Sequence, residues 1–274
     1  MNLDIDFKYK ELTDELLKEI PFTPDIAIVL GSGLGDFAKN IDLIKSIPTS
    51  SLPGYPKSTV HGHEGYIHFA KCSGKNILIF QGRVHFYEGY KLNECIIPVH
   101  ITETLNCGKL ILTNAAGGIN THFSPGDLML ITSFLALNLK KELTELIGLT
   151  SIENRNSFIN LPSKRMNQII HNAALEEKIN LKEGSYWFSK GPSYETAAEI
   201  KMMAQMGIDS VGMSTVHEAI YASIRNIEVG AVSLITNFAA GISKEKLSHN
   251  EVIETAELAK TKFEKLIKKV IELS

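Results

Sequence analysis

The stretch that most constrains the fold of this chain is LILTNAAGGIN, residues 110–120. Its apolar start, residues 110–112, is typical of a strand buried on both faces, as in a parallel sheet that carries helices on each side. The small residues at 114–118 then predict a loop at the carboxyl end of that strand. Such a loop lets backbone N–H groups approach a ligand, and ligands of open α/β sheets bind at this edge. A tight turn without a ligand is the alternative.

A second apolar run lies at residues 26–30, and the glycine-rich GSGLG follows it directly at residues 31–35. The glycines have the spacing GxGxG, and no acidic residue follows a second strand at the distance that a dinucleotide site requires. The turn can nevertheless hold a phosphate through backbone N–H groups, and Ser32 adds a hydroxyl.

The segment GRVHFYEGY follows two expected neighbouring strands, at residues 66–71 and 76–80. Arg83, His85 and Tyr87 alternate within it, so an extended chain would point all three to one side. A guanidinium, an imidazole and a phenol on one side suit a phosphate. An edge strand with solvated polar residues is the alternative.

Residues 48–65 are rich in Pro, Gly and Ser and predict a long loop, which in a compact domain is often functional. The loop ends in HGHEG, which contains His61 and His63. A metal site here would need further ligands. The other interpretation is a loop that brings imidazole to an anion or a sugar.

The sequence GPSYET at residues 191–196 predicts the start of a helix that runs to about residue 206, with Glu195 in its first turn. A carboxylate in that position interacts favourably with the positive end of the helix dipole, which needs no functional role. The functional interpretation is a carboxylate beside a pocket, with Tyr194 stacked on a flat ligand.

Thr215 and Glu218 have the spacing of a capping box, so we expect a helix from Val216. Ser214 then lies just before a helix N-terminus, which is a natural site for an anion or a hydroxyl. Met213 is by default a core residue.

The longest β-like run is residues 228–236, and it ends at Asn237 and further small residues. Ser248 and Glu251 have the spacing of another capping box, so a helix is expected from there to near the end of the chain. His249 would lie in its first turn.

Composition excludes several classes of protein. The net charge of −3 and the absence of a basic stripe with interleaved aromatics argue against a nucleic-acid partner. Three cysteines without a CxxC motif give neither a disulfide framework nor a thiolate zinc site. No apolar run reaches membrane-spanning length, and the first residues lack a secretory h-region, so we expect a cytoplasmic protein with no membrane partner.

Strand and helix patterns alternate along the chain. Helical patterns lie at residues 8–19, at 93–107 around Pro98, and at 134–180, where residues 154–156 separate two of them. No linker or repeat interrupts this order. We therefore predict one α/β domain over residues 1–274, with a mixed, mostly parallel central sheet flanked by helices.

From about residue 24 to the C-terminus, the chain resembles the trimeric purine nucleoside phosphorylases. The motifs that carry the resemblance stand in register, in this order: GSGLG, His63, GRVHFYEG, TNAAGG (113–118), GPSYET, VGMST (211–215) and ITN (235–237). Each motif is weak alone, and the set is specific. The resemblance implies a phosphorylase-type α/β fold, a homotrimer, and reversible phosphorolysis of purine nucleosides to free purine and pentose 1-phosphate.

The resemblance also implies a role for each matched position. The phosphate ligands would be Ser32, His63, Arg83, His85, Ser214 and the backbone of Ala115. The sugar would lie against Tyr87, Met213 and His249, and the purine against Tyr194, Glu195, Val211 and Asn237. Asn237, Glu195 and His85 would be the catalytic residues. The family needs no cofactor or metal, because inorganic phosphate is a co-substrate.

The chain departs from the family pattern at some positions. Tyr194 stands where the family usually has Phe, and Phe238 replaces a Lys of animal members. Residues 140–165 lack the pattern that supplies an aromatic side chain to the neighbouring subunit's sugar site, and Phe158 is the nearest candidate.

These residue types suit the chemistry. Phosphate is itself the nucleophile against an oxocarbenium-like sugar, so the protein has mainly to position an anion. Asn237 can donate to N7 or O6 as charge grows on the departing purine. Glu195 can accept N1–H of hypoxanthine or guanine but would face a lone pair of adenine, which favours inosine and guanosine.

Three alternatives remain open at this point. One is a related phosphorylase that prefers xanthosine or methylthioadenosine, although methylthioadenosine phosphorylases carry Asp at the position of Asn237. The second is a metal-dependent hydrolase built on His61, His63 and His85. The third is a nucleoside- or dinucleotide-binding module without turnover.

Overall fold

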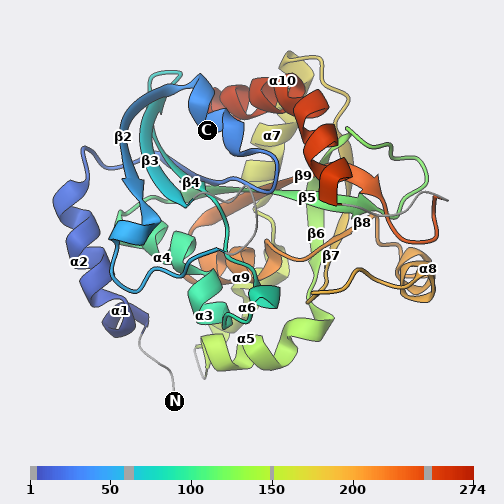
Figure 1. The fold of residues 1–274 in the computed structure, drawn as a ribbon, viewed down its shortest axis with the longest axis horizontal. Coiled ribbons are helices and arrows are strands. Elements are labelled where there is room, and N and C mark those ends of the chain that lie inside the picture. Colours follow the sequence, from blue (N-terminus) through green and yellow to red (C-terminus); the bar gives the residue numbers. More distant parts are fainter. Residues whose placement is uncertain (1–4, 59–64, 149–150, 244–248) are drawn as a thin grey trace.

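The computed structural model describes residues 5–58, 65–148, 151–243 and 249–274. Groups of strands and groups of helices follow one another along the chain, and the predicted one-by-one alternation is found only in its last third (Figure 1). The strands are β1 (Ile26–Val29), β2 (Asp42–Pro48), β3 (Tyr66–Cys72), β4 (Lys75–Gln81), β5 (Lys109–Gly118), β6 (Leu128–Leu135), β7 (Lys182–Phe188), β8 (Ser210–Gly212) and β9 (Glu228–Phe238). The α-helices are α1 (Ile5–Lys8), α2 (Lys10–Glu19), α3 (Leu92–Cys95), α4 (Ile97–Thr104), α5 (Lys140–Ile147), α6 (Ile152–Ser157), α7 (Lys164–Glu176), α8 (Ala197–Gln205), α9 (Val216–Ile224) and α10 (His249–Leu273).

All the strands belong to one sheet with the order β2-β3-β4-β1-β5-β8-β7-β6-β9. An additional pairing of β5 with β9 closes the last part of this order into a ring. The pairs β1–β4, β1–β5, β5–β9, β6–β7 and β7–β8 are parallel, and β2–β3, β3–β4, β5–β8 and β6–β9 are antiparallel. The predicted fold class, a mixed and mostly parallel sheet in an α/β protein, is therefore confirmed.

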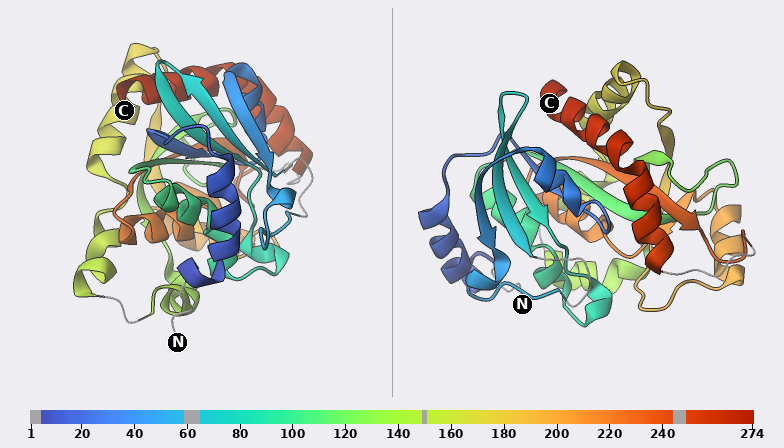
Figure 2. Two further views of the ribbon diagram at one scale, coloured as in Figure 1. Left: turned by 90° about the vertical axis from the view of Figure 1, so that its left-hand side faces the viewer. Right: turned by 45° about the horizontal axis from the view of Figure 1, so that its top comes forward.

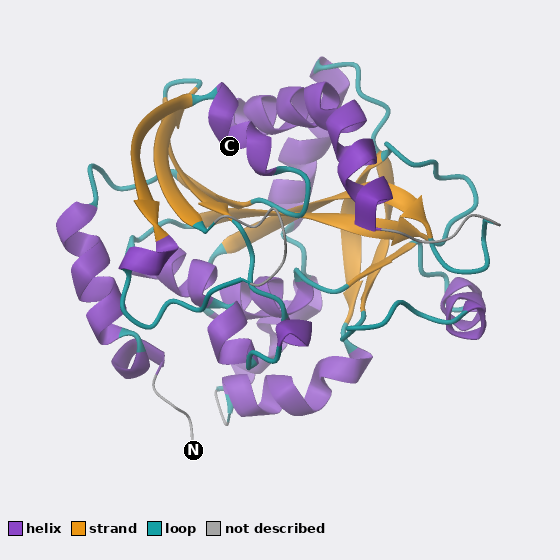
Figure 3. Cartoon of the chain, in the orientation of Figure 1, coloured by secondary structure: helices purple, strands orange, loops and turns teal. Residues whose placement is uncertain are grey.

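The sheet is covered on both faces, which explains the unbroken apolar runs of its inner strands. In β1, Ile26 and Ile28 belong to the core on the side of α7 and α10, whereas Ala27 and Val29 belong to the core on the side of α2, α4 and α9. The two further views show α10 lying along the sheet (Figure 2), and the strands lie between two groups of helices (Figure 3). None of the helices in the described ranges is long and apolar enough to cross a membrane.

The predicted loop at residues 114–118 is wrong, because these residues continue strand β5. Their backbones pair with β9 as far as Gly118, and Gly117 also pairs with Val211 of β8. Small side chains are needed here because β9 packs closely against this part of β5: a Cβ on Gly118 would lie 3.0 Å from Ile235 Cγ2. The small residues at 114–118 therefore form the end of a strand and not a loop.

Three other local predictions need correction. The expected helix at 93–107 is two helices, α3 and α4, although Pro98 does set the start of a helix, since it lies in the first turn of α4. Residues 154–156, predicted to separate two helices, lie inside α6. Strand β2 was not predicted, since most of its side chains are exposed and it lies at an edge of the sheet.

The join between β1 and β5 depends on Gly31. A Cβ at this position would lie 2.6 Å from the Cα of Asn114 and 2.8 Å from the carbonyl oxygen of Thr113. The Gly31 N–H donates to Thr113 Oγ1 at 3.0 Å, and the same hydroxyl donates to the Val29 carbonyl at 3.0 Å. Gly31 thus allows the turn that carries Ser32 to cross directly over β5.

We expect Gly31→Ala to destabilise the fold by about 1–3 kcal/mol, because the new methyl group meets backbone that cannot move aside. The matched control is Gly108→Ala, since a Cβ there meets nothing within 4 Å and should change stability by less than about 0.5 kcal/mol. Urea unfolding measures both. Equal stability of the two variants would contradict the close approach.

Candidate functional site

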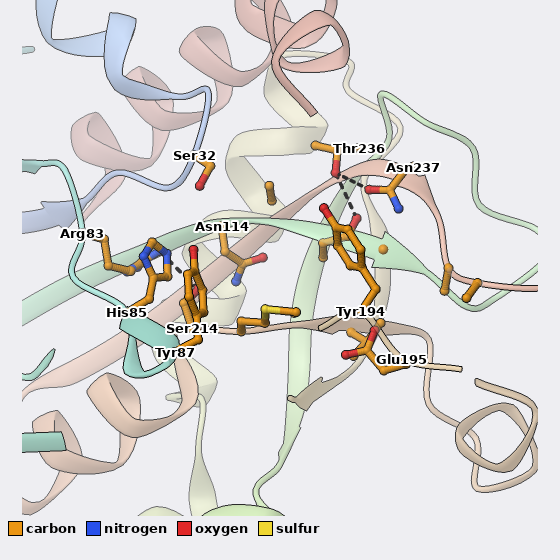
Figure 4. Close-up of a pocket in the computed structure, with 18 residues that line it drawn as sticks. Ser32, Arg83, His85, Tyr87, Asn114, Tyr194, Glu195, Ser214, Thr236 and Asn237 are labelled. Carbon is orange, nitrogen blue, oxygen red and sulfur yellow. Dashed lines mark hydrogen bonds between the residues drawn. The ribbon is translucent and has the colours of Figure 1, made fainter. Parts of the chain in front are cut away.

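One pocket lies where β5, β8 and β9 end, and it collects the predicted site residues (Figure 4). Every predicted residue whose side chain the structure describes lines it. The lining residues are Ser32, Arg83, His85, Tyr87, Asn114, Ala115, Ala116, Gly117, Tyr194, Glu195, Val211, Gly212, Met213, Ser214, Thr236, Asn237, Ala239 and Ala240.

The two remaining predicted residues cannot be placed in the site. His63, expected near phosphate, lies outside the described residues, as does His61 of the metal hypothesis. His249, expected at the sugar, begins helix α10, but its side chain is not among those described. Ser248 of the predicted capping box also lies outside the described residues.

The pocket has two chemically different ends with Asn114 between them (Figure 4). One end carries the guanidinium, the imidazole and two hydroxyls, from Arg83, His85, Ser32 and Ser214. The other carries a phenol, a carboxylate, a hydroxyl and an amide, from Tyr194, Glu195, Thr236 and Asn237. The first end suits an anion, and the second suits a flat polar heterocycle.

Arg83 is held rigidly although it is a long side chain. It is only 2% exposed, and its Nε donates to Glu218 Oε1 at 3.1 Å. Its Nη1 donates to the Thr113 carbonyl at 2.8 Å and to Ser214 Oγ at 3.4 Å. The guanidinium is therefore hydrogen-bonded to β5 and to residues around the start of α9. Because the side chain is already ordered, anion binding costs little further conformational entropy.

His85 is oriented by its own turn. The Glu88 carboxylate, which is 2% exposed, accepts the His85 backbone N–H at 2.7 Å and lies 3.2 Å from ring Nδ1. The imidazole stacks on the Tyr87 ring with centroids 4.8 Å apart. The predicted extended alternation is wrong here, because residues 86–88 form a 3₁₀ turn, yet Arg83, His85 and Tyr87 still reach one pocket.

Tyr87 keeps its proton at working pH. Burial, aided by the neighbouring Glu88 carboxylate, raises the pKa of Tyr87 to about 12. A phenol in this state can both donate and accept a hydrogen bond, as contact with a sugar hydroxyl requires.

Ser214 lies just before helix α9, as predicted. The expected capping interaction is present, since the Thr215 backbone N–H donates to Glu218 Oε2 at 3.0 Å. His217, which precedes Glu218 in helix α9, is fully buried, and burial lowers the pKa of its imidazole to about 4. His217 is therefore neutral at pH 7 and does not compete with Arg83 for the Glu218 charge.

Glu195 is not in the first turn of a helix, which corrects the sequence prediction. Helix α8 begins at Ala197, and Thr196 caps it by accepting the Glu199 N–H at 3.3 Å. Glu199 in turn accepts the Thr196 N–H at 2.7 Å, so this second glutamate takes the capping role. Glu195 lines the pocket, and its Oε1 is buried with no hydrogen-bond partner among the described residues.

Asn237 is fixed by its neighbours on β9. The Thr236 hydroxyl donates to Asn237 Oδ1 at 2.8 Å, which commits that oxygen as an acceptor. Asn237 Nδ2 donates to the Phe238 carbonyl at 2.9 Å, and an amide nitrogen carries a second N–H. The amide therefore has a donor left to offer to a ligand.

Sequence reasoning missed the supporting groups of the site. Glu88, Glu218 and Thr236 hold His85, Arg83 and Asn237, and none of the three was assigned a role in the pocket. Glu88 follows His85 by three residues, and this spacing could have indicated it. The bond between Arg83 and Glu218 joins residues far apart in the chain and had no such local signal.

Within the described ranges, one group of residues has its potential metal-ligand atoms close together, namely Asp6, His100 and Glu103. It does not line the pocket. Arg225 lies among these groups, with Nη1 3.3 Å from Glu103 Oε1 and Nη2 3.9 Å from Asp6 Oδ1. Both carboxylates of this group are therefore paired with the Arg225 guanidinium.

Comparison with known proteins identifies the family of this chain. The family model of the Phosphorylase superfamily matches residues 25–272. Purine nucleoside phosphorylase 1 of Geobacillus stearothermophilus is 41% identical over 265 residues, covering 95% of this chain and 96% of that protein. Purine nucleoside phosphorylase 1 of Bacillus subtilis is 39% identical over 260 residues, covering 93% of this chain and 94% of that protein.

Solved structures resemble the fold closely. A Schistosoma purine nucleoside phosphorylase in complex with hypoxanthine gives a TM-score of 0.87 at 30% identity, covering 99% of this chain and 97% of that one. Isoform 2 from Schistosoma mansoni, in complex with cytosine and ribose-1-phosphate, gives 0.86 at 32% identity, covering 98% and 97%. The chain belongs to the Phosphorylase superfamily and, within it, to the purine nucleoside phosphorylases, which are pentosyltransferases.

Proposed function

We propose that this phosphorylase acts on 6-oxopurine nucleosides and deoxynucleosides, such as inosine and guanosine, and releases the free purine and the pentose 1-phosphate. The observation that carries the choice of base is Glu195 Oε1, a buried pocket acceptor without a partner among the described residues. A buried carboxylate oxygen left without a donor costs free energy, and N1–H of hypoxanthine or guanine would supply that donor. Adenine presents a lone pair at N1, so it offers no donor and Glu195 Oε1 would remain without a hydrogen bond.

The anion end of the pocket would bind phosphate. Arg83 supplies a fixed cation, and His85, Ser32, Ser214, the Ala115 backbone and, by analogy with the family, His63 would complete the ligands. Held in place, the phosphate would attack C1′ of the sugar, which would lie against Tyr87, Met213 and His249. Positioning of this kind can supply much of the rate enhancement.

The base end would stabilise the departing purine. Val211 and the Tyr194 ring would hold the flat base, and the free N–H of Asn237 would donate to N7 or O6 as negative charge develops there. Because Thr236 and Phe238 already fix the amide, the donor needs no reorganisation during the reaction. No cofactor or metal is required in this scheme, since phosphate is the second substrate.

Solved Schistosoma relatives, at 28–30% identity, hold inosine, guanosine and also adenosine. Binding of a base by such proteins therefore does not show which nucleoside is cleaved, and the proposal concerns the rate of cleavage of each nucleoside.

We further propose a cytoplasmic homotrimer, by analogy with the family, without nucleic-acid or membrane partners. Phe158 is the candidate aromatic for a neighbouring subunit's sugar site.

The first prediction concerns the co-substrate. Release of hypoxanthine from inosine should require phosphate and should fall to background when phosphate is removed, because phosphate is the proposed nucleophile against C1′. Base release from inosine, guanosine, xanthosine, adenosine and methylthioadenosine should be followed by chromatography with and without phosphate. Inosine cleavage that continues at full rate without phosphate would sink the proposal.

The second prediction concerns the choice of base. Glu195→Gln should lower kcat/KM for inosine by roughly 10- to 100-fold and raise that for adenosine, because an amide can donate to N1 of adenine. Glu199→Gln is the matched control, since it makes the same change at the cap of α8, at a residue that does not line the pocket. Unchanged inosine kinetics in Glu195→Gln would remove Glu195 from the base site.

A further inference from the structure

Glu218 is a buried carboxylate directly behind the pocket that touches two different parts of the anion end. It is fully buried, and its two oxygens have separate tasks. Oε1 accepts the Arg83 Nε–H at 3.1 Å, whereas Oε2 accepts the Thr215 backbone N–H at 3.0 Å. A single rigid group therefore sets the position of the cation and of the turn that carries Ser214.

That turn is strained and has to be held. Thr215 has φ 76° and ψ −49°, which is unusual for a β-branched residue. The Val216 N–H donates back to the Ser214 carbonyl at 2.8 Å, which makes a tight three-residue γ-turn centred on Thr215. Such a conformation persists only when the surrounding bonds fix it.

Side-chain hydrogen bonds next to the pocket fix this turn. Asn114 Nδ2 donates to Thr215 Oγ1 at 2.9 Å, and the Thr215 and Ser214 hydroxyls are 3.1 Å apart. With Glu218 on the backbone N–H, these contacts turn the Ser214 hydroxyl toward Arg83, whose Nη1 lies 3.4 Å away. Arg83 and Ser214 thus form one preassembled unit, and both depend on Glu218.

We propose that Glu218 is a positioning residue for phosphate: it holds Arg83 and the strained Thr215 turn in one geometry, so that the guanidinium and the Ser214 hydroxyl meet the anion together. This inference rests on the proposed function, because it assumes that the anion end binds phosphate. It assigns to Glu218 no contact with either substrate.

A purely electrostatic role predicts the opposite result, which makes the proposal testable. A carboxylate behind the site repels phosphate, so its neutralisation by itself would strengthen phosphate binding. Loss of the hydrogen bonds from Glu218 to Arg83 and Thr215 would instead weaken phosphate binding. In Glu218→Gln, one oxygen is replaced by an NH₂ donor, which would face either the Arg83 Nε–H or the Thr215 N–H and so release one of the two anchors.

The experiment measures steady-state kinetics with phosphate and inosine varied in turn. Glu218→Gln should raise the phosphate KM by roughly 10- to 100-fold and leave the inosine KM within about 3-fold of the unsubstituted protein. Glu218→Asp keeps the charge but is one methylene shorter, and it should also raise the phosphate KM. The control is Glu103→Gln, which makes the same change at the partly exposed Arg225–Glu103 pair and should alter neither constant.

A second variant covers the case in which Glu218→Gln does not fold. Thr215→Gly leaves no buried charge unpaired and relieves the positive φ, but it frees the turn, so its phosphate KM should rise as well. A normal or lower phosphate KM in the Glu218 variants, or in Thr215→Gly if they do not fold, would overturn the inference. Phosphate-independent cleavage by the unsubstituted protein would instead overturn the proposed function, and this inference with it.

Discussion

The parallel pairing of β5 with β9 is the interaction on which the rest of the structure depends. It runs from Lys109 opposite Glu228 to Gly118 opposite Phe238, with an irregularity between Ala116 and Gly117. The pairing closes the ring of the sheet and places Gly117 opposite Asn237. The anion end, beside Asn114, and the base end, beside Asn237, therefore lie along the same pair of strands, on either side of this irregularity.

Around this ladder, the polar site is assembled in pairs of an active group and a buried support. Glu218 supports Arg83, Glu88 supports His85, and the Thr236 hydroxyl supports Asn237. The side chains that face the pocket are therefore already oriented before a ligand arrives. Preorganisation of this kind reduces the free energy that must be spent on ordering when substrates bind.

The sequence predicted the architecture and most of the pocket, but not how the pocket is held together. Apolar runs such as 26–30 and 110–112 predicted buried strands because both faces of the sheet are covered. The continuation of β5 through residues 114–118 could not be predicted, since its partner strand lies far away in the chain and its small residues favour turns. The same holds for Glu218, which has a local capping signal and a distant partner, Arg83.

The most direct test of the account follows phosphate itself. Phosphorus NMR of the protein with inosine and inorganic phosphate distinguishes a pentose 1-phosphate ester from unreacted phosphate. We expect the ester signal to grow in step with hypoxanthine, one for one, as the inorganic phosphate signal falls. Release of hypoxanthine with the inorganic phosphate signal unchanged would show that water attacks the sugar, and would contradict the assignment of the anion end to phosphate.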